Sequence, residues 1–129
     1  MIVLVTGGRK YRDKARLYRV MDSVLASLVR GEVLYVVHGN APGADSLAAD
    51  WIYDAQKAGH AVFEIRCPAP WDGPHKRGAG FARNFVQAQL VSSFPEKRRG
   101  AIAFPGGNGT LNQITACEAL GIPVMKVDW

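Results

Sequence analysis

The sequence has few cysteines, no long hydrophobic run and no metal-ligand spacing. Its 129 residues include two cysteines, Cys67 and Cys117, without a CxxC pair, which favours reduced thiols over a disulfide framework or a zinc site. The longest apolar runs contain four or five residues, far below the roughly 20 that cross a bilayer. The N-terminus lacks the basic flank and small-residue cleavage site of a signal peptide. We therefore expect a cytoplasmic protein with no membrane association and no bound metal.

The remaining composition is that of a globular protein. Hydrophobic residues make up 48% of the chain and charged residues 21%, values that exclude disorder, collagen and coiled coil. A chain of this length can bury one hydrophobic core and is too short for two. We therefore expect a single domain over residues 1–129.

Positive charge is in excess. The chain has 16 Lys and Arg against 11 Asp and Glu, a net charge of +5. One basic cluster occupies residues 9–19 and a second occupies residues 97–99. Such an excess suits an anionic partner, either a phosphorylated small molecule or nucleic acid. For residues 14–19 the alternative is a solvated helix face.

Hydrophobic periodicity predicts alternating strands and helices along the whole chain. Short apolar runs predict strands at residues 2–5, 33–37, 61–65, 101–104 and 123–127, and spacings of three and four predict helices at 17–28, 44–55, 81–91 and 110–120. We place Trp51 in the core, and Ala82, Phe85, Val86 and Leu90 on the apolar side of the third helix. Strands joined by helical crossovers give an α/β fold, a three-layer Rossmann-like sandwich with a mainly parallel five-stranded sheet.

Glycine-rich turns follow three of these strands, at residues 6–9, 38–45 and 105–110. Ligands bind beyond the carboxyl ends of the strands in such sheets, and glycine lets backbone N–H groups approach a ligand closely. A helix N-terminus after the turn favours phosphate. The alternative is that the turns are only tight connections. The dinucleotide fingerprint GxGxxG and the P-loop are both absent, which excludes ordinary NAD dehydrogenases and P-loop NTPases.

A series of motifs supports a family resemblance. In order, these are Val5–Arg9 with Tyr11 and Asp13; His38–Gly39 with Gly43–Asp45 and Trp51; Trp71; Gly78–Gly80 with Arg83–Asn84; and Ala103–Gly107 with Gly109–Thr110. The series resembles the YspA/cpYpsA-related branch of the SLOG superfamily over essentially the whole chain. That superfamily also includes the LOG-type ("lysine decarboxylase-like") phosphoribohydrolases and the DNA-processing protein A domain.

The resemblance implies a binding site for a nucleotide or a nucleotide-derived ligand. Backbone N–H groups of residues 106–110 and the Thr110 hydroxyl would hold phosphate, with Arg9 across the cleft. Arg83 and Asn84 would supply a planar cation and an amide. The predicted ligand-binding residues are Gly7, Gly8, Arg9, His38, Gly39, Gly43, Asp45, Arg83, Asn84, Pro105, Gly106, Gly107, Asn108, Gly109 and Thr110.

The same resemblance bears on catalysis. In the LOG-type motif a glutamate assists cleavage of the N-glycosidic bond, and this sequence has Gln113 there, preceded by Asn112. Such cleavage needs a nearby anion or general acid, so Asp45 is the candidate catalytic residue. The alternative for Asp45 is a helix cap or first-turn charge. For His38 the alternative is a buried structural histidine, and Trp71 would either stack on a base or pack its loop.

We therefore expect a protein that binds a nucleotide-derived small molecule, without a cofactor, and with phosphoribohydrolase-like activity if it is an enzyme. The alternatives are a nucleic-acid-binding module and a non-catalytic nucleotide sensor or sequestering protein. Because relatives assemble through helices that flank the sheet, the resemblance also implies a homo-oligomer.

Overall fold

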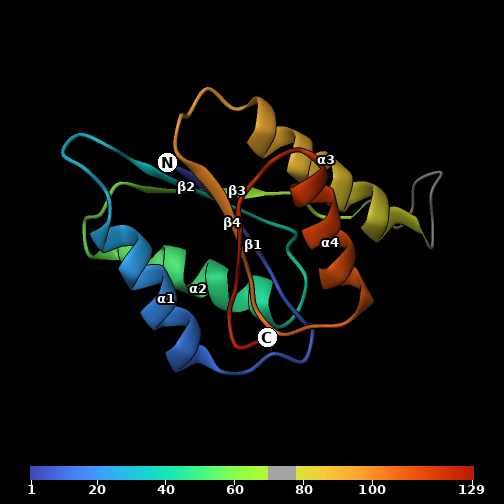
Figure 1. Ribbon diagram of the computed structural model, residues 1–129. Coiled ribbons are helices and arrows are strands. Elements are labelled where there is room, and N and C mark those ends of the chain that lie inside the picture. Colours follow the sequence, from blue (N-terminus) through green and yellow to red (C-terminus); the bar gives the residue numbers. More distant parts are fainter. Residues whose placement is uncertain (70–77) are drawn as a thin grey trace.

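A parallel sheet lies between two pairs of helices (Figure 1). The computed structural model describes residues 1–69 and 78–129. The strands are β1 (Ile2–Thr6), β2 (Leu34–His38), β3 (Val62–Arg66), β4 (Arg99–Ala103) and β5 (Val124–Lys126); the helices are α1 (Lys14–Ala26), α2 (Ala44–Lys57), α3 (Ala79–Ser93) and α4 (Asn108–Ala119). Each overlaps its predicted range. The α/β sandwich is confirmed, and every strand pair is parallel.

The strand order creates a place for a ligand. The sheet runs β3-β2-β1-β4-β5, so the chain winds outward from β1 to β3 and then returns to the other side of β1. Winding therefore reverses between β1 and β4, where the loops that follow two neighbouring strands diverge. Because Thr6 pairs with Ala103, the glycine-rich loops after β1 and β4 begin side by side.

Strand β1 joins two hydrophobic cores. Val3 and Val5 pack with residues of α1 and α2, among them the predicted core residue Trp51. Ile2 and Leu4, on the opposite face, pack with residues of α3 and α4. This alternation follows from the strand period of two, and apolar residues on both faces make β1 a fully buried strand.

Helix α1 begins at Lys14, three residues before its predicted range. The Asp13 carboxylate accepts a hydrogen bond from the Arg16 backbone N–H at 3.1 Å and caps the helix. Leu17, Val20 and Met21 are buried beneath it. The cap fixes where the β1–α1 loop ends, and this loop forms one wall of the site described below.

The buried side of α3 differs from the predicted one. Phe85 and Val86 are about half exposed, at 51% and 55%. The buried residues are instead Ala79, Asn84, Gln87, Ala88 and Val91. The prediction was wrong for Phe85 and Val86, because two amides lie on the inner side of this helix, whereas Leu90 is partly buried and packs against the core.

Candidate functional site

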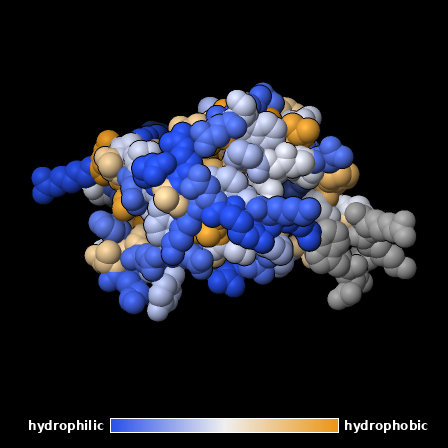
Figure 2. All heavy atoms as spheres, turned by 90° about the horizontal axis from the view of Figure 1, so that it is seen from below, coloured by the Kyte–Doolittle hydropathy of each residue, from blue (hydrophilic) through white to orange (hydrophobic). Residues whose placement is uncertain are grey.

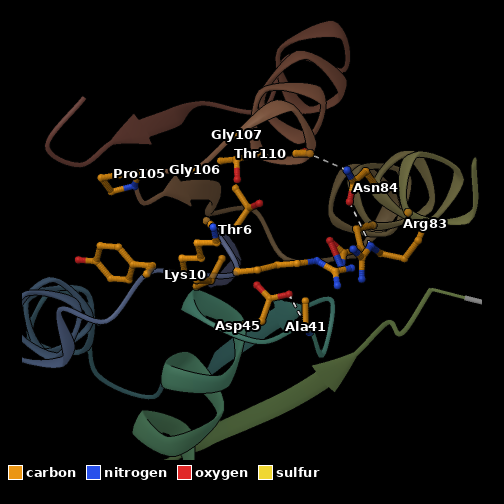
Figure 3. A pocket seen from close by; sticks show the side chains of 18 of the residues that line it. Thr6, Lys10, Ala41, Asp45, Arg83, Asn84, Pro105, Gly106, Gly107 and Thr110 are labelled. Carbon is orange, nitrogen blue, oxygen red and sulfur yellow. Dashed lines mark hydrogen bonds between the residues drawn. The ribbon is translucent and has the colours of Figure 1, made fainter. Parts of the chain in front are cut away.

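A cavity of about 830 Å³ opens at the C-terminal edge of the sheet, where the winding reverses. Its size is typical of small-molecule sites. Its walls come from the β1–α1 loop, the start of α2, the first turns of α3 and the β4–α4 loop (Figure 3). Seen from that edge, the surface is mostly hydrophilic (Figure 2). The cavity therefore offers a polar entrance to a bound molecule.

Most of the predicted ligand-binding residues line this cavity. They are Gly7, Gly8, Arg9, Asp45, Arg83, Asn84, Pro105, Gly106, Gly107, Gly109 and Thr110. His38, Gly39, Gly43 and Asn108 are not part of the lining among residues 1–69 and 78–129. Segments that are far apart in the sequence thus meet at one place, while part of the β2–α2 loop lies behind it.

The β4–α4 loop presents backbone donors to the cavity. Helix α4 has Gly107 as its N-cap, with no side-chain cap and no acidic residue in the first turn. Its first internal hydrogen bond runs from the Leu111 N–H to the Gly107 carbonyl at 3.0 Å. The N–H groups of residues 108–110 therefore lack partners within the helix, and they add to the positive end of its dipole. Such a helix end binds anions.

Gly107 and Gly109 have no steric reason to be glycine. A Cβ atom at either position would have no heavy atom within 4 Å. Gly107 has a φ of −99°, outside the left-handed region that favours glycine. At Gly109, in the first turn of α4, glycine is less favourable than alanine. The open space next to these two residues is instead available to a ligand that approaches the bare backbone.

Other glycines around the cavity are required by packing. A Cβ at Gly7 would lie 2.5 Å from the Ala44 Cβ, and one at Gly8 would lie 2.9 Å from the Pro105 carbonyl oxygen. Gly43 has a φ of +85°, and a Cβ there would lie 2.6 Å from the Arg9 carbonyl carbon. These positions hold the three loops against one another, and they shape the cavity.

Arg83 connects α3 to two strand ends. Its Nη1 donates hydrogen bonds to the carbonyls of Gly39, at 2.6 Å, and Cys67, at 3.2 Å, and its Nε donates to the Asn84 side chain at 3.0 Å. Burial, with a contribution from nearby Arg9, lowers the pKa of Arg83. The guanidinium packs directly over Gly39, where a Cβ would clash with it. Arg83 thus puts a half-buried positive charge on the cavity wall.

Asn84 links α3 to α4. Its amide nitrogen donates to the Gly109 carbonyl at 3.1 Å and to the Asn112 side chain at 3.0 Å. Because both acceptors lie within the first five residues of α4, Asn84 holds the N-terminal end of that helix in place. Figure 3 shows Asn84 and Arg83 side by side, facing Thr110 and Asp45 respectively.

Asp45 lies in the first turn of α2 but does not cap it, since Gly43 is the N-cap. Its Oδ2 accepts hydrogen bonds from the backbone N–H groups of Gly39, at 3.1 Å, and Ala41, at 3.2 Å. Burial raises the pKa of Asp45, although these bonds and the charge of Arg83 act in the opposite direction. Asp45 therefore shapes the β2–α2 loop and also presents a carboxyl group to the cavity.

His38 is fully buried at the end of β2. Its Nδ1 accepts a hydrogen bond from the Asn40 backbone N–H at 3.0 Å, and its Nε2 lies 2.7 Å from the Glu64 carboxylate. Because Nδ1 is an acceptor, the ring proton resides on Nε2 and is donated to Glu64. Both ring nitrogens are thus used within the fold.

Gln113 points away from the cavity. It is 1% exposed, and its amide nitrogen donates to the Asn84 carbonyl at 2.9 Å. Its neighbour Cys117 is a free, buried thiol, and burial raises its pKa to about 11. Asn112 bonds Asn84, as described above. The two amides at the position of the LOG-type motif therefore hold α3 and α4 together.

Several lining residues were not predicted. Lys10 and Arg12 are exposed at the β1–α1 loop, and Phe81 and Gln87 come from α3. The basic cluster at residues 9–19 was a signal for the first two. Gln87 lies three residues after Asn84, on the same side of the helix, so the helical period could have found it once α3 was oriented correctly. Trp71 lies outside the described residues.

No group of three or more His, Cys, Asp and Glu side chains within residues 1–69 and 78–129 is arranged to hold a metal ion. In the same residues, no helix has the length and apolar character needed to span a membrane.

The fold and the site define a class: a Rossmann-like domain with a glycine-lined cavity where the sheet reverses its winding. Residues 1–73 match the YspA, cpYpsA-related SLOG family. The chain is also 32% identical over 126 residues to the "Gene 61 protein" of Mycobacterium phage D29, an alignment that covers 96% of this chain and 94% of the phage protein. The chain belongs to the YspA, cpYpsA-related SLOG family.

Proposed function

We propose that this domain binds a nucleotide or a nucleotide-derived phosphorylated ligand in the cavity, with phosphate at the N-terminus of α4. The observation that carries the proposal is the pair of open glycines, Gly107 and Gly109, at an uncapped helix end. Packing does not require glycine at either position, and bare backbone at an uncapped helix end lets a phosphate approach its N–H groups closely.

The charge of the cavity supports the same ligand. Four lining residues are basic, namely Arg9, Lys10, Arg12 and Arg83, and two are acidic, Asp13 and Asp45. Asp13 is already used to cap α1, and Asp45 accepts two backbone hydrogen bonds. The cations therefore dominate the field at the entrance and attract an anionic ligand.

Thermal unfolding in the presence of candidate ligands tests the proposal. The panel contains nucleoside monophosphates, ADP-ribose, cyclic nucleotides and a short single-stranded oligonucleotide. A ligand at about a hundred times its Kd adds roughly 2.7 kcal/mol of stability, which raises the Tm by several degrees for a domain of this size. A shift with the oligonucleotide alone, lost in high salt, would instead support a nucleic-acid-binding module.

The substitution Gly107→Leu sharpens this test. Because a Cβ at Gly107 would have no heavy atom within 4 Å, we expect the free variant to fold. We expect it to lose about 1 kcal/mol in the free energy of unfolding, because glycine is preferred to leucine at an N-cap. We also expect it to lose at least about tenfold in nucleotide affinity, since the new side chain fills the phosphate position. Thr115→Leu, an exposed change on the same helix outside the cavity lining, is the matched control. Unchanged affinity in Gly107→Leu would place the ligand elsewhere.

Cleavage of an N-glycosidic bond is the second candidate function, and it is favoured by one observation. Asp45 lines the cavity with a carboxyl group whose pKa burial raises, and a raised pKa suits a general acid. Chromatography for free base released from nucleoside monophosphates tests this activity. Release that survives Asp45→Asn would remove Asp45 from the catalytic role, and an absence of release would leave binding or sensing as the function.

A further inference from the structure

Gln87 is a buried polar residue of α3 whose amide nitrogen has no hydrogen-bond partner among the described residues. Its side chain is 2% exposed and lines the cavity. Asn84, one turn earlier on the same side of the helix, uses both ends of its amide within the fold. Gln87 therefore differs from Asn84 in partners although both are buried.

A buried amide without partners is unfavourable for the folded state. Burial removes water from the N–H groups of the Gln87 amide, and no hydrogen bond within residues 1–69 and 78–129 replaces it. An apolar residue of similar shape would fill the same space without this penalty. Glutamine at position 87 therefore stabilises the folded protein less than methionine would. Such a loss of stability is typical of residues that bind a ligand.

The place of Gln87 indicates which part of a ligand it contacts. It is one helical turn beyond Arg83 and almost fully buried. A carboxamide is uncharged and offers a donor next to an acceptor. Its natural partner is a neutral group with an adjacent acceptor and donor, such as the edge of a nucleobase or a pair of sugar hydroxyls.

We propose that Gln87 is a specificity-determining residue that hydrogen-bonds the uncharged part of the nucleotide while the phosphate lies at the N-terminus of α4. This inference rests on the proposed function and goes further. It implies that the cavity discriminates between nucleotides and simple phosphates, and that the base or sugar is buried on the inner face of α3. The exposed end of the ligand is then its phosphate, near Lys10 and Arg12.

The test compares Gln87→Met with the wild type by titration calorimetry and thermal unfolding. The probes are inorganic pyrophosphate, ribose 5-phosphate and the four common ribonucleoside monophosphates. Gln89→Met, an exposed change on the same helix, is the matched control. We expect Gln87→Met to weaken binding of the preferred nucleotide by roughly tenfold, as loss of a neutral hydrogen bond does, and to leave pyrophosphate affinity unchanged. A weakened response to ribose 5-phosphate as well would assign the contact to the sugar; otherwise it belongs to the base.

The Tm of the ligand-free variant provides a second, independent test. We expect the ligand-free Gln87→Met variant to unfold at a higher temperature than the wild type, because an unpaired buried amide has been replaced by an apolar side chain. Gln113 also has a buried amide atom without a partner, its Oε1. If Gln87 paired with Gln113 instead of a ligand, Gln87→Met would unfold at a lower temperature, which would overturn the inference.

The outcomes separate the two proposals. Equal nucleotide affinity in Gln87→Met and the wild type would refute the role of Gln87 and leave the phosphate site intact. If the wild type binds pyrophosphate but none of the nucleotides, the role of Gln87 is also refuted and the phosphate site is retained. If the wild type binds none of the probes, the proposed function itself fails.

Discussion

The glycines around the cavity form two groups, and the difference between them separates folding from function. Gly7, Gly8 and Gly43 lie where the β1–α1, β2–α2 and β4–α4 loops press against one another, and a Cβ at any of them would overlap a neighbour. Gly107 and Gly109 lie on the same edge of the sheet with open space beside them. Packing explains the first group but not the second, and we attribute the second to the proposed phosphate.

The largest effect on the free energy of unfolding is expected at Gly43, where a Cβ would overlap a neighbouring loop. Gly43→Ala combines a positive φ with overlap against the β1–α1 loop, so we expect a loss of about 3 kcal/mol or more in the free energy of unfolding. Urea denaturation measures it. Gly59→Ala is the matched control, because Gly59 has a φ of +88° and no heavy atom near its Cβ position. A loss of only about 1–2 kcal/mol at both positions, the value for backbone strain alone, would show that crowding at Gly43 is unimportant.

A smaller effect is expected at Asp45, which holds the crowded β2–α2 loop. Because burial raises the pKa of Asp45 above its unfolded value, the folded protein binds a proton more tightly than the unfolded protein does. The resulting stability is fully present below the unfolded pKa of about 3.9 and is lost as the pH rises through the folded pKa. We expect the free energy of unfolding to fall with pH in the wild type above about pH 4, and Asp45→Asn to remove that fall.

Urea denaturation of the wild type and Asp45→Asn between pH 3.5 and 8 measures this difference. Asn keeps an oxygen that can accept from the Gly39 and Ala41 N–H groups, so the variant isolates the charge. A difference in stability between the two proteins that does not change with pH would contradict the raised pKa.

The smallest effect on the free energy of unfolding is expected at Gly109, which has open space beside it. Gly109→Ala lies in the first turn of α4, where alanine is the better helix former, and its new methyl group meets no neighbour. We therefore expect a gain of about 0.5 kcal/mol in the free energy of unfolding, together with weaker nucleotide binding. Thermal unfolding with and without nucleotide measures both. A loss of stability would mean that Gly109, like Gly43, is required by the fold.

The sequence predicted the fold well because its signals are local. Apolar runs and helical spacings marked every strand and helix, and the glycine-rich turns marked the edge of the sheet at which the cavity lies. The order of the strands was not predicted, because it depends on contacts between segments far apart in the sequence.

The sequence could not distinguish the roles of similar residues. The glycine-rich turn after β2 resembles the one that contains Gly107 and Gly109. Its residues nevertheless contact other parts of the fold: His38, at the end of β2, contacts Glu64, Gly39 contacts Arg83, and Gly43 contacts the β1–α1 loop. Which side of a loop faces a cavity depends on contacts between distant segments. Gln87 was missed for a related reason, because a helix with apolar residues on its exposed side misleads the periodicity.

The most direct test of the central claim is a backbone amide NMR titration of the wild-type domain with the nucleotide that raises its Tm most. If phosphate binds at the N-terminus of α4, the largest chemical-shift changes will be at the N–H groups of residues 107–110. Those of Gly31 and Gly59, which lie in turns outside the cavity lining, will scarcely move. Saturable binding that leaves residues 107–110 unperturbed would contradict the claim.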